Sequence, residues 1–171
     1  RDSKHDLVYQ CYVSSCEMWL DHAQQASQAP GSGLDKIVSM IAVHLEQYAA
    51  SLQNEAPHFA MLTEVSSLDE SHREDIFRRW SEIFELCRVM VVQGIDEGAI
   101  DEVDPAVVTL AIFSIIQWFP VWLNRKHVAN IRAVVTSVLD IAINGLSSQS
   151  LEFKLTTVSY THLTLPTRSY V

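Results

Sequence analysis

The most apolar segment of the chain extends from Asp104 to Leu146 and consists of two helix-like runs. The first run opens with Asp104-Pro105, a side-chain cap followed by the residue that best tolerates the first position of a helix. It is apolar on almost every side, and a second run from about Val128 carries apolar residues at steps of three and four. A helix that is apolar all round must be covered on more than one side. We therefore expect one side of this helix pair to pack within the protomer and the other to contact a second copy.

The first third of the chain is amphipathic with the period of an α-helix. A Ser-x-x-Asp start signal at Ser3 predicts a first helix from about Lys4 to about Gln25. A break around Pro30 predicts a loop, because proline lacks a backbone donor and the glycines beside it permit left-handed backbone. The apolar stripe that follows predicts a second helix over about 34–54.

The middle of the chain continues the helical pattern. A short helix is expected over 58–65, and a capping box that begins at Ser71 predicts a longer helix after it. That helix carries two apolar stripes, which predict a central helix packed on both sides: Ile76, Trp80, Ile83, Cys87 and Met90 form one, and Phe77, Phe84, Val91 and Ile95 the other. No segment of the first 148 residues alternates with a period of two. The sequence therefore predicts an all-α fold of about six helices over residues 3–148, ending in a two-helix dimerisation hairpin.

The last stretch of the chain differs in composition from the rest. Residues 158–167 can be back-translated, with permitted codons, into the end of a common transposon-derived sequencing-library adapter, and they resemble adapter read-through. We therefore expect a single domain over residues 1–148. Residues 149–171 are expected to be a non-native or disordered tail without an evolved role.

The charge and the cysteines narrow the class of protein. Twelve Lys and Arg stand against 21 Asp and Glu, which gives a formal net charge of −9. Because affinity for DNA comes largely from basic residues that release counterions, this chain by itself is expected to bind DNA poorly. Cys11, Cys16 and Cys87 have neither a paired Cys-x-x-Cys nor a zinc spacing. We interpret them as reduced, mostly buried thiols of a cytoplasmic protein.

The sequence patterns fit a membrane protein, a di-iron bundle or a common enzyme motif poorly. Residues 106–123 are long enough to test as a membrane span, but interior polar residues and the short joint to a polar helix favour a buried soluble hairpin and no membrane. Residues 55–58 have the Glu-x-x-His spacing of di-iron bundles, yet Pro57 prevents a regular helix and no second copy is present. No phosphate loop, nucleophile elbow or metal triad is found. We expect no catalytic residue, no metal and no cofactor.

Three features together resemble the TetR family of bacterial transcriptional regulators. Ser3 to Val8 is similar to the segment that opens the fourth helix of that family, after its three-helix DNA-binding head. The turn from Gly94 through Gly98 to Ile100, followed by Asp104-Pro105, resembles the turn that leads into the family's penultimate helix. The two final apolar helices match the family's dimerisation pair in position.

The resemblance implies a non-enzymatic function. The chain starts with Arg1 rather than Met, so we expect a fragment of a longer protein whose helix-turn-helix head is absent here. The fragment would be the effector-sensing, dimerising domain of a repressor. It would form a homodimer, bind a small apolar or amphipathic ligand, and control DNA binding by the missing head. Two alternatives stay open: a helical homodimeric module without a ligand, and a ferritin-like helical enzyme or metal carrier.

Candidate ligand and interface residues follow from this interpretation. Eight residues are candidates for the ligand pocket, although aromatic stripes at helical spacing are also typical of plain core: Met18, His44, Tyr48, Phe59, Trp80, Phe84, Phe113 and Gln117. Five apolar residues of the last two helices are candidates for the centre of an isologous dimer interface: Ile112, Ile116, Val135, Leu139 and Ile143.

Overall fold

The computed structural model describes residues 4–52, 62–122 and 131–144, and every regular element within these ranges is helical. The elements are five α-helices and one 3-10 helix: α1 Lys4–Gln28, α2 Gly33–Leu52, η1 Leu62–Ser67, α3 Glu70–Asp96, α4 Pro105–Trp122 and α5 Ile131–Asn144. The prediction of an all-α fold is confirmed. The predicted tail and residue 59 lie outside the described residues.

Local hydrogen bonds explain where α2 begins. The Ser32 hydroxyl accepts a hydrogen bond from the Asp35 backbone N–H at 3.1 Å, and the Asp35 carboxylate accepts one from the Ser32 N–H at 2.9 Å. This reciprocal pair is a capping box that satisfies two N–H groups at the helix start. From the sequence we predicted only a loop here. The spacing Ser32-x-x-Asp35 is a capping-box signal that this prediction did not use.

The start of α3 corrects the sequence-based expectation. The helix begins at Glu70, because Asp69 is its cap and accepts a hydrogen bond from the His72 N–H at 3.0 Å. Ser71, which was expected to begin the capping box, instead donates its hydroxyl to the Asp69 carboxylate at 3.0 Å. An ionised cap also lies at the positive end of the helix dipole, which favours Asp69 as the cap.

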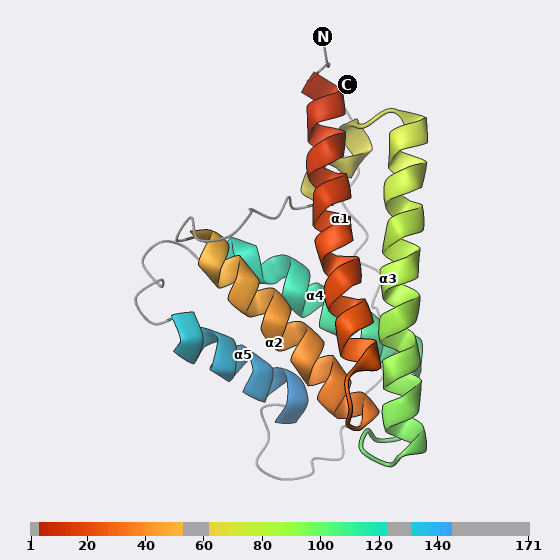
Figure 1. Cartoon of the computed structure of the whole chain (residues 1–171), viewed down its shortest axis with the longest axis vertical. Coiled ribbons are helices and arrows are strands. Elements are labelled where there is room, and N and C mark those ends of the chain that lie inside the picture. The colour runs from red at the N-terminus through yellow and green to blue at the C-terminus, as the bar shows by residue number, and fades with distance from the viewer. Residues whose placement is uncertain (1–3, 53–61, 123–130, 145–171) are drawn as a thin grey trace, which may run out of the picture.

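The helices are arranged around α2. The long helices α1 and α3 lie side by side and point in the same direction, while α2 runs obliquely across them (Figure 1). Helix α2 packs against α1, α3, α4 and α5, so α2 is the central helix. The prediction that α3 is covered on both sides is wrong at Phe77, whose side chain is 57% exposed. None of the helices in the described ranges is both long and apolar enough to span a membrane.

A tight turn joins α3 to α4. The Gly94 carbonyl accepts hydrogen bonds from the Ala99 N–H at 2.8 Å and the Ile100 N–H at 2.9 Å, and Gly98 has a φ of 70°. Only glycine takes this left-handed conformation without strain. The Asp104 carboxylate then accepts a hydrogen bond from the Ala106 N–H at 2.8 Å, as the predicted Asp-Pro start of α4 requires.

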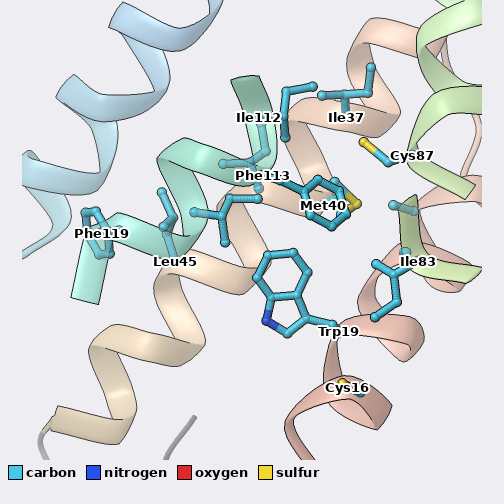
Figure 2. Packing of buried hydrophobic residues seen from close by; sticks show 14 of the residues in the cluster. Cys16, Trp19, Ile37, Met40, Leu45, Ile83, Cys87, Ile112, Phe113 and Phe119 are labelled. Carbon is cyan, nitrogen blue, oxygen red and sulfur yellow. The ribbon is translucent and has the colours of Figure 1, made fainter. Parts of the chain in front are cut away.

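The core lies where α1, α2, α3 and α4 meet. Figure 2 shows Trp19, Met40 and Phe113 gathered at this junction, with Leu45 and Phe119 further along α2 and α4. Cys16 and Cys87 are buried within the core, and Cys11 is exposed. Burial raises the pKa of the Cys16 thiol to about 11 and that of Cys87 to about 12. Both thiols are therefore packing groups rather than nucleophiles.

Candidate functional site

An aromatic cluster occupies the junction of four helices. Trp19 of α1 lies edge-on to His44 of α2, with ring centroids 4.0 Å apart. Phe113 of α4 is 5.3 Å from Trp19 and 5.3 Å from Trp80 of α3, also between ring centroids. These distances and tilted geometries are the favourable ones for aromatic pairs. The cluster therefore fixes the relative positions of α1, α2, α3 and α4.

One further candidate residue, Phe84, extends this cluster, and another, Tyr48, forms a separate ring pair. Phe84 lies 5.7 Å from Phe113 between ring centroids, and Tyr48 lies 6.0 Å from Phe119 in an edge-on arrangement. The rings contact one another directly. A ligand that entered among them would have to separate them first.

A buried polar network borders the aromatic cluster. The Nδ1 atoms of His22 and His44 are 3.4 Å apart, and the Nε2 atom of His22 lies 2.6 Å from the Gln47 Oε1 atom. Because a carbonyl oxygen can only accept, His22 carries its proton on Nε2, and His44 then donates from Nδ1 to the free lone pair of His22. The Gln47 amide donates to the Met18 sulfur at 3.1 Å.

The electrostatics of this network favour a neutral His44. Burial and the neighbouring His22 lower the pKa of His44 well below its ordinary value. The network acts as a polar contact between α1 and α2.

The structure brings some of the candidate pocket residues together and leaves others apart. Met18 accepts a hydrogen bond from Gln47, and Tyr48 pairs with Phe119. His44, Trp80, Phe84 and Phe113 come together in one cluster, as the sequence suggested for a shared site. Gln117 is half-buried on α4. The role of all these residues as ligand contacts stays a prediction.

An apolar cavity lies between α2, α4 and α5. Its volume is about 470 Å³, and α2 forms its floor while α4 and α5 form its walls. Its described lining consists of Leu34, Ile37, Ile41, Ala99, Ile100, Asp101, Val103, Val107, Val108, Ala111, Ile112, Ile115, Ala142 and Ile143. The seven candidate pocket residues that the structure describes are not among them, and Phe59 lies outside the described residues. Two of the lining residues, Ile37 and Ile112, are labelled in Figure 2.

Sequence patterns gave two usable signals for this cavity. Ala111 and Ala142 interrupt runs of larger aliphatic residues on α4 and α5, and both line the cavity. A small residue on an apolar face leaves space that a larger one would fill. The pairing of α5 with α2, which creates the cavity, could not be read from local sequence.

The end of the cavity is held by a close crossing of two backbones. Gly33 at the start of α2 packs directly on the backbone of Gly94, which leaves no room for a side chain at residue 33. The Gly33 N–H donates to the Glu97 carboxylate at 2.9 Å, and the Lys36 ammonium donates to the Gln93 side chain at 3.0 Å. These contacts fix the α3–α4 turn against α2.

The five candidate interface residues differ in burial. Within the protomer Ile112, Ile116 and Val135 are buried, and only 2% of Ile116 is exposed. Leu139 and Ile143 of α5 are half-buried. Helix α4 also exposes Leu110 at 57% and Trp118 at 54%. An isologous interface stays a prediction.

A polar cluster joins the first turns of α1 and α3. The Asp75 carboxylate accepts hydrogen bonds from the Tyr9 hydroxyl at 2.9 Å and the Arg79 Nε at 2.7 Å, and it also pairs with Arg78. The two arginines and the Tyr9 hydroxyl lower the pKa of Asp75. The Tyr9 ring stacks on the His72 ring with centroids 3.9 Å apart. The cluster therefore couples the two helices at their N-terminal ends.

Three solved structures that share the fold are distant from this chain in sequence. A TetR family regulator, PfmR from Thermus thermophilus, matches with a TM-score of 0.71 and 17% identity over 85% of this chain and 78% of its own. A TetR/AcrR family regulator from Thermobifida fusca matches with a TM-score of 0.70 and 20% identity over 85% of this chain and 75% of its own.

A third match is AibR, solved in complex with isovaleryl coenzyme A and operator DNA. Its TM-score is 0.70 at 13% identity, and the match covers 82% of this chain and 75% of AibR. No curated protein matches the chain significantly in sequence.

The family model of the tetracyclin repressor-like C-terminal domain matches residues 30–146, which is more than half of the chain. The members of this family are transcriptional regulators rather than enzymes. The chain therefore belongs to the TetR family of transcriptional regulators and comprises its C-terminal, ligand-binding domain.

Proposed function

We propose that this domain senses a small apolar or amphipathic effector and dimerises, and that it thereby controls DNA binding by a helix-turn-helix head in a longer parent protein. The cavity between α2, α4 and α5 carries the proposal. Its volume of about 470 Å³ lies within the range of roughly 300–1,000 Å³ that is usual for ligand sites. An apolar cavity of this size gives a small molecule a place to bind without unpacking the aromatic cluster.

A second observation favours dimerisation. Leu110, Ser114 and Trp118 recur at helical spacing on α4 and are exposed, and none of the three lines the cavity. Exposed apolar stripes of this kind are typical of protein–protein contacts. In a two-fold dimer the same stripe of each copy would meet its counterpart.

Sedimentation of matched variants tests the dimer. Leu110→Glu should shift the chain from dimer to monomer at micromolar concentration, because it places a charge in the apolar contact. Phe77→Glu is the control, since Phe77 is equally exposed but lies on α3. A wild-type chain that is monomeric, or two variants that behave alike, would remove this interface.

The effector would act by shifting a population of dimers. AibR has been solved with both isovaleryl coenzyme A and operator DNA, which shows that this other protein can hold both. In the parent of the present chain, a helix shift would change the separation of two DNA-reading heads. Such coupling requires that the effector bind the two conformations with different affinity. A regulator of this kind would act in the bacterial cytoplasm.

Thermal unfolding with a ligand panel tests sensing. The panel should contain acyl-CoAs, aromatic compounds and cationic drugs, and a ligand at a hundred times its dissociation constant should add about 2.7 kcal/mol of stability. The absence of any shift would favour the alternative of a helical dimer without a ligand. The Glu-x-x-His spacing behind the alternative of a ferritin-like metal carrier, at residues 55–58, lies outside the described residues, so this alternative stays open.

A further inference from the structure

We propose that the cavity between α2, α4 and α5 selects a positively charged amphiphile, with its hydrophobic part inside and its cationic end at Asp101, over anionic ligands such as coenzyme A thioesters. This inference rests on the proposed sensing function and names the chemical class of its effector.

The interior of the cavity can accommodate only a hydrophobic group. Among the described residues that line it, thirteen of fourteen are apolar, and they include the buried side chains of Ile37, Ile41 and Ile112. Of these described side chains, Asp101 alone carries a polar group. An alkyl chain or ring system would gain free energy there in proportion to the apolar surface that it buries. A polar or charged group would lose its hydration without compensation.

The charged residues between Gly98 and Pro105, the connection from α3 to α4, are all acidic. Asp101 is the one charged residue in the part of the lining that the structure describes, it is exposed, and it is followed by Glu102 and Asp104. The sequence has no Lys or Arg between Arg88 and Arg125. A phosphate-bearing ligand therefore has no cation within this segment to receive it, whereas a cation meets a negative field.

The nearest basic residue on the floor helix is already engaged. Lys36 of α2 donates to the Gln93 side chain at 3.0 Å. Hydrogen bonds from Gln93 and the Gly33 N–H, and to a lesser extent the Lys36 charge, lower the pKa of Glu97. The Lys36 ammonium therefore belongs to the contact that fixes α2 to the end of α3. An anionic ligand would have to compete with this contact.

The position of Asp101 sets the orientation of the ligand. Asp101 is exposed and belongs to an otherwise apolar described lining, so a cation can pair with its carboxylate while remaining hydrated. Exposed ion pairs contribute modestly, which corresponds to about a threefold preference rather than an absolute one. Salt should weaken that preference, since screening acts on exposed charges.

Three probes with the same alkyl chain test the selectivity on the full chain. Decyltrimethylammonium, decanol and decanoate are titrated below their micelle concentrations by calorimetry. The expected order of affinity is cation, then neutral alcohol, then anion, with the difference between cation and alcohol reduced at high salt. Equal affinities for the cation and the anion would overturn the charge preference.

Substitutions at two neighbouring carboxylates distinguish a direct ion pair with Asp101 from the general negative potential of this segment. Asp101→Asn should weaken the cation by about threefold and leave decanol unchanged. Glu102→Gln removes the same charge from a residue that does not line the cavity, and it should change the cation affinity less. Equal effects of the two variants would overturn the assignment of Asp101.

A pair of alanines on α5 tests the location. Ala142→Trp fills the cavity and should weaken all three probes by about tenfold or more, while Ala133→Trp lies on the opposite, exposed side of α5. Probe binding that survives Ala142→Trp overturns the site. If Ala142→Trp makes a dimer monomeric, the cavity receives a second copy instead, which also overturns it. The sensing function would still stand if another compound class in the thermal panel bound elsewhere.

Discussion

Gly33 and Gly94 cross so closely that a Cβ atom on Gly33 would lie 2.8 Å from the Gly94 Cα and nearer still to the Met90 carbonyl oxygen. Real Cβ atoms do not approach backbone atoms at such distances. The start of α2 and the end of α3 therefore fit together only because residue 33 lacks a side chain. The same crossing fixes one end of the apolar cavity.

Gly33→Ala should lower the free energy of unfolding by about 2–3 kcal/mol, because the added methyl group forces two backbones apart. Urea denaturation followed by circular dichroism measures this loss. Gly98→Ala is the control: Gly98 has a left-handed φ but open space around it, so its cost should be about 1 kcal/mol. If the two variants are equally stable, the crossing is looser than described.

His44 should make stability depend on pH. The unfolded chain takes up a proton on His44 near the ordinary pKa of 6.5, whereas burial and His22 lower the pKa in the folded state. Acidification therefore favours unfolding, and stability should fall by about 1 kcal/mol per pH unit from roughly pH 6.5 downward until the folded-state pKa is reached. Denaturation of wild type and His44→Gln across this range measures the difference. His5→Gln is the control, because His5 is exposed. Parallel pH profiles for wild type and His44→Gln would contradict the prediction.

Tyr9→Phe should weaken the link between α1 and α3. It removes a hydrogen bond to a carboxylate that is only partly exposed, and we expect a loss of about 1 kcal/mol after allowance for solvent screening. A double-mutant cycle with Asp75→Asn isolates the coupling. The coupling should disappear in acid as the Asp75 carboxylate, whose pKa is lowered in the folded state, becomes protonated. Additive effects at neutral pH would show that the contact contributes nothing.

Phe113→Ala should be among the most destabilising core substitutions. Phe113 contacts Trp19, Trp80 and Phe84, so its removal leaves a cavity among three helices and should cost about 3–5 kcal/mol. Trp118→Ala on the same helix removes an exposed side chain and serves as the control. At protein concentrations where the chain is monomeric, its cost should be below about 1 kcal/mol. Comparable losses would mean that the cluster is not the core.

Deletion of residues 149–171 tests the proposed domain limit. If this tail has no evolved role, the shortened chain should unfold at the same urea concentration and sediment in the same oligomeric state as the full chain. Sequencing of the native locus is an independent check, because a genome that encodes residues 158–167 in frame would contradict the adapter interpretation. A marked loss of stability on deletion would extend the domain beyond residue 148.

Much of the fold could be predicted because its signals are local. The Asp104-Pro105 start of α4 and the turn at Gly98 depend on backbone rules that a few residues specify. The stripe of α2 likewise predicted the buried side chains of Ile37, Ile41 and Leu45. The cap at Asp69 was missed because two neighbouring residues, Asp69 and Ser71, are both good caps, and only the folded geometry selects between them.

The candidate site was harder to predict from the sequence than the helices, because it depends on which helices pack against one another. Trp80, Phe84 and Phe113 were correctly grouped as a set that could share one place, since each lies on an apolar face. The cavity was missed because its floor comes from α2 and its walls from helices more than sixty residues later. Burial of Ile112 and Ile116 was not foreseen either, since periodicity cannot tell the inner side of an all-apolar helix from its outer side.

Helix α5 packs mainly against one neighbour, α2, whereas α2 contacts four helices. Peripheral elements with few partners open at a lower free energy than the whole domain. The backbone amides of α5 should therefore exchange with solvent deuterium earlier than those of α2. A compound held between α4 and α5 would slow that exchange, which makes α5 the natural reporter of occupancy.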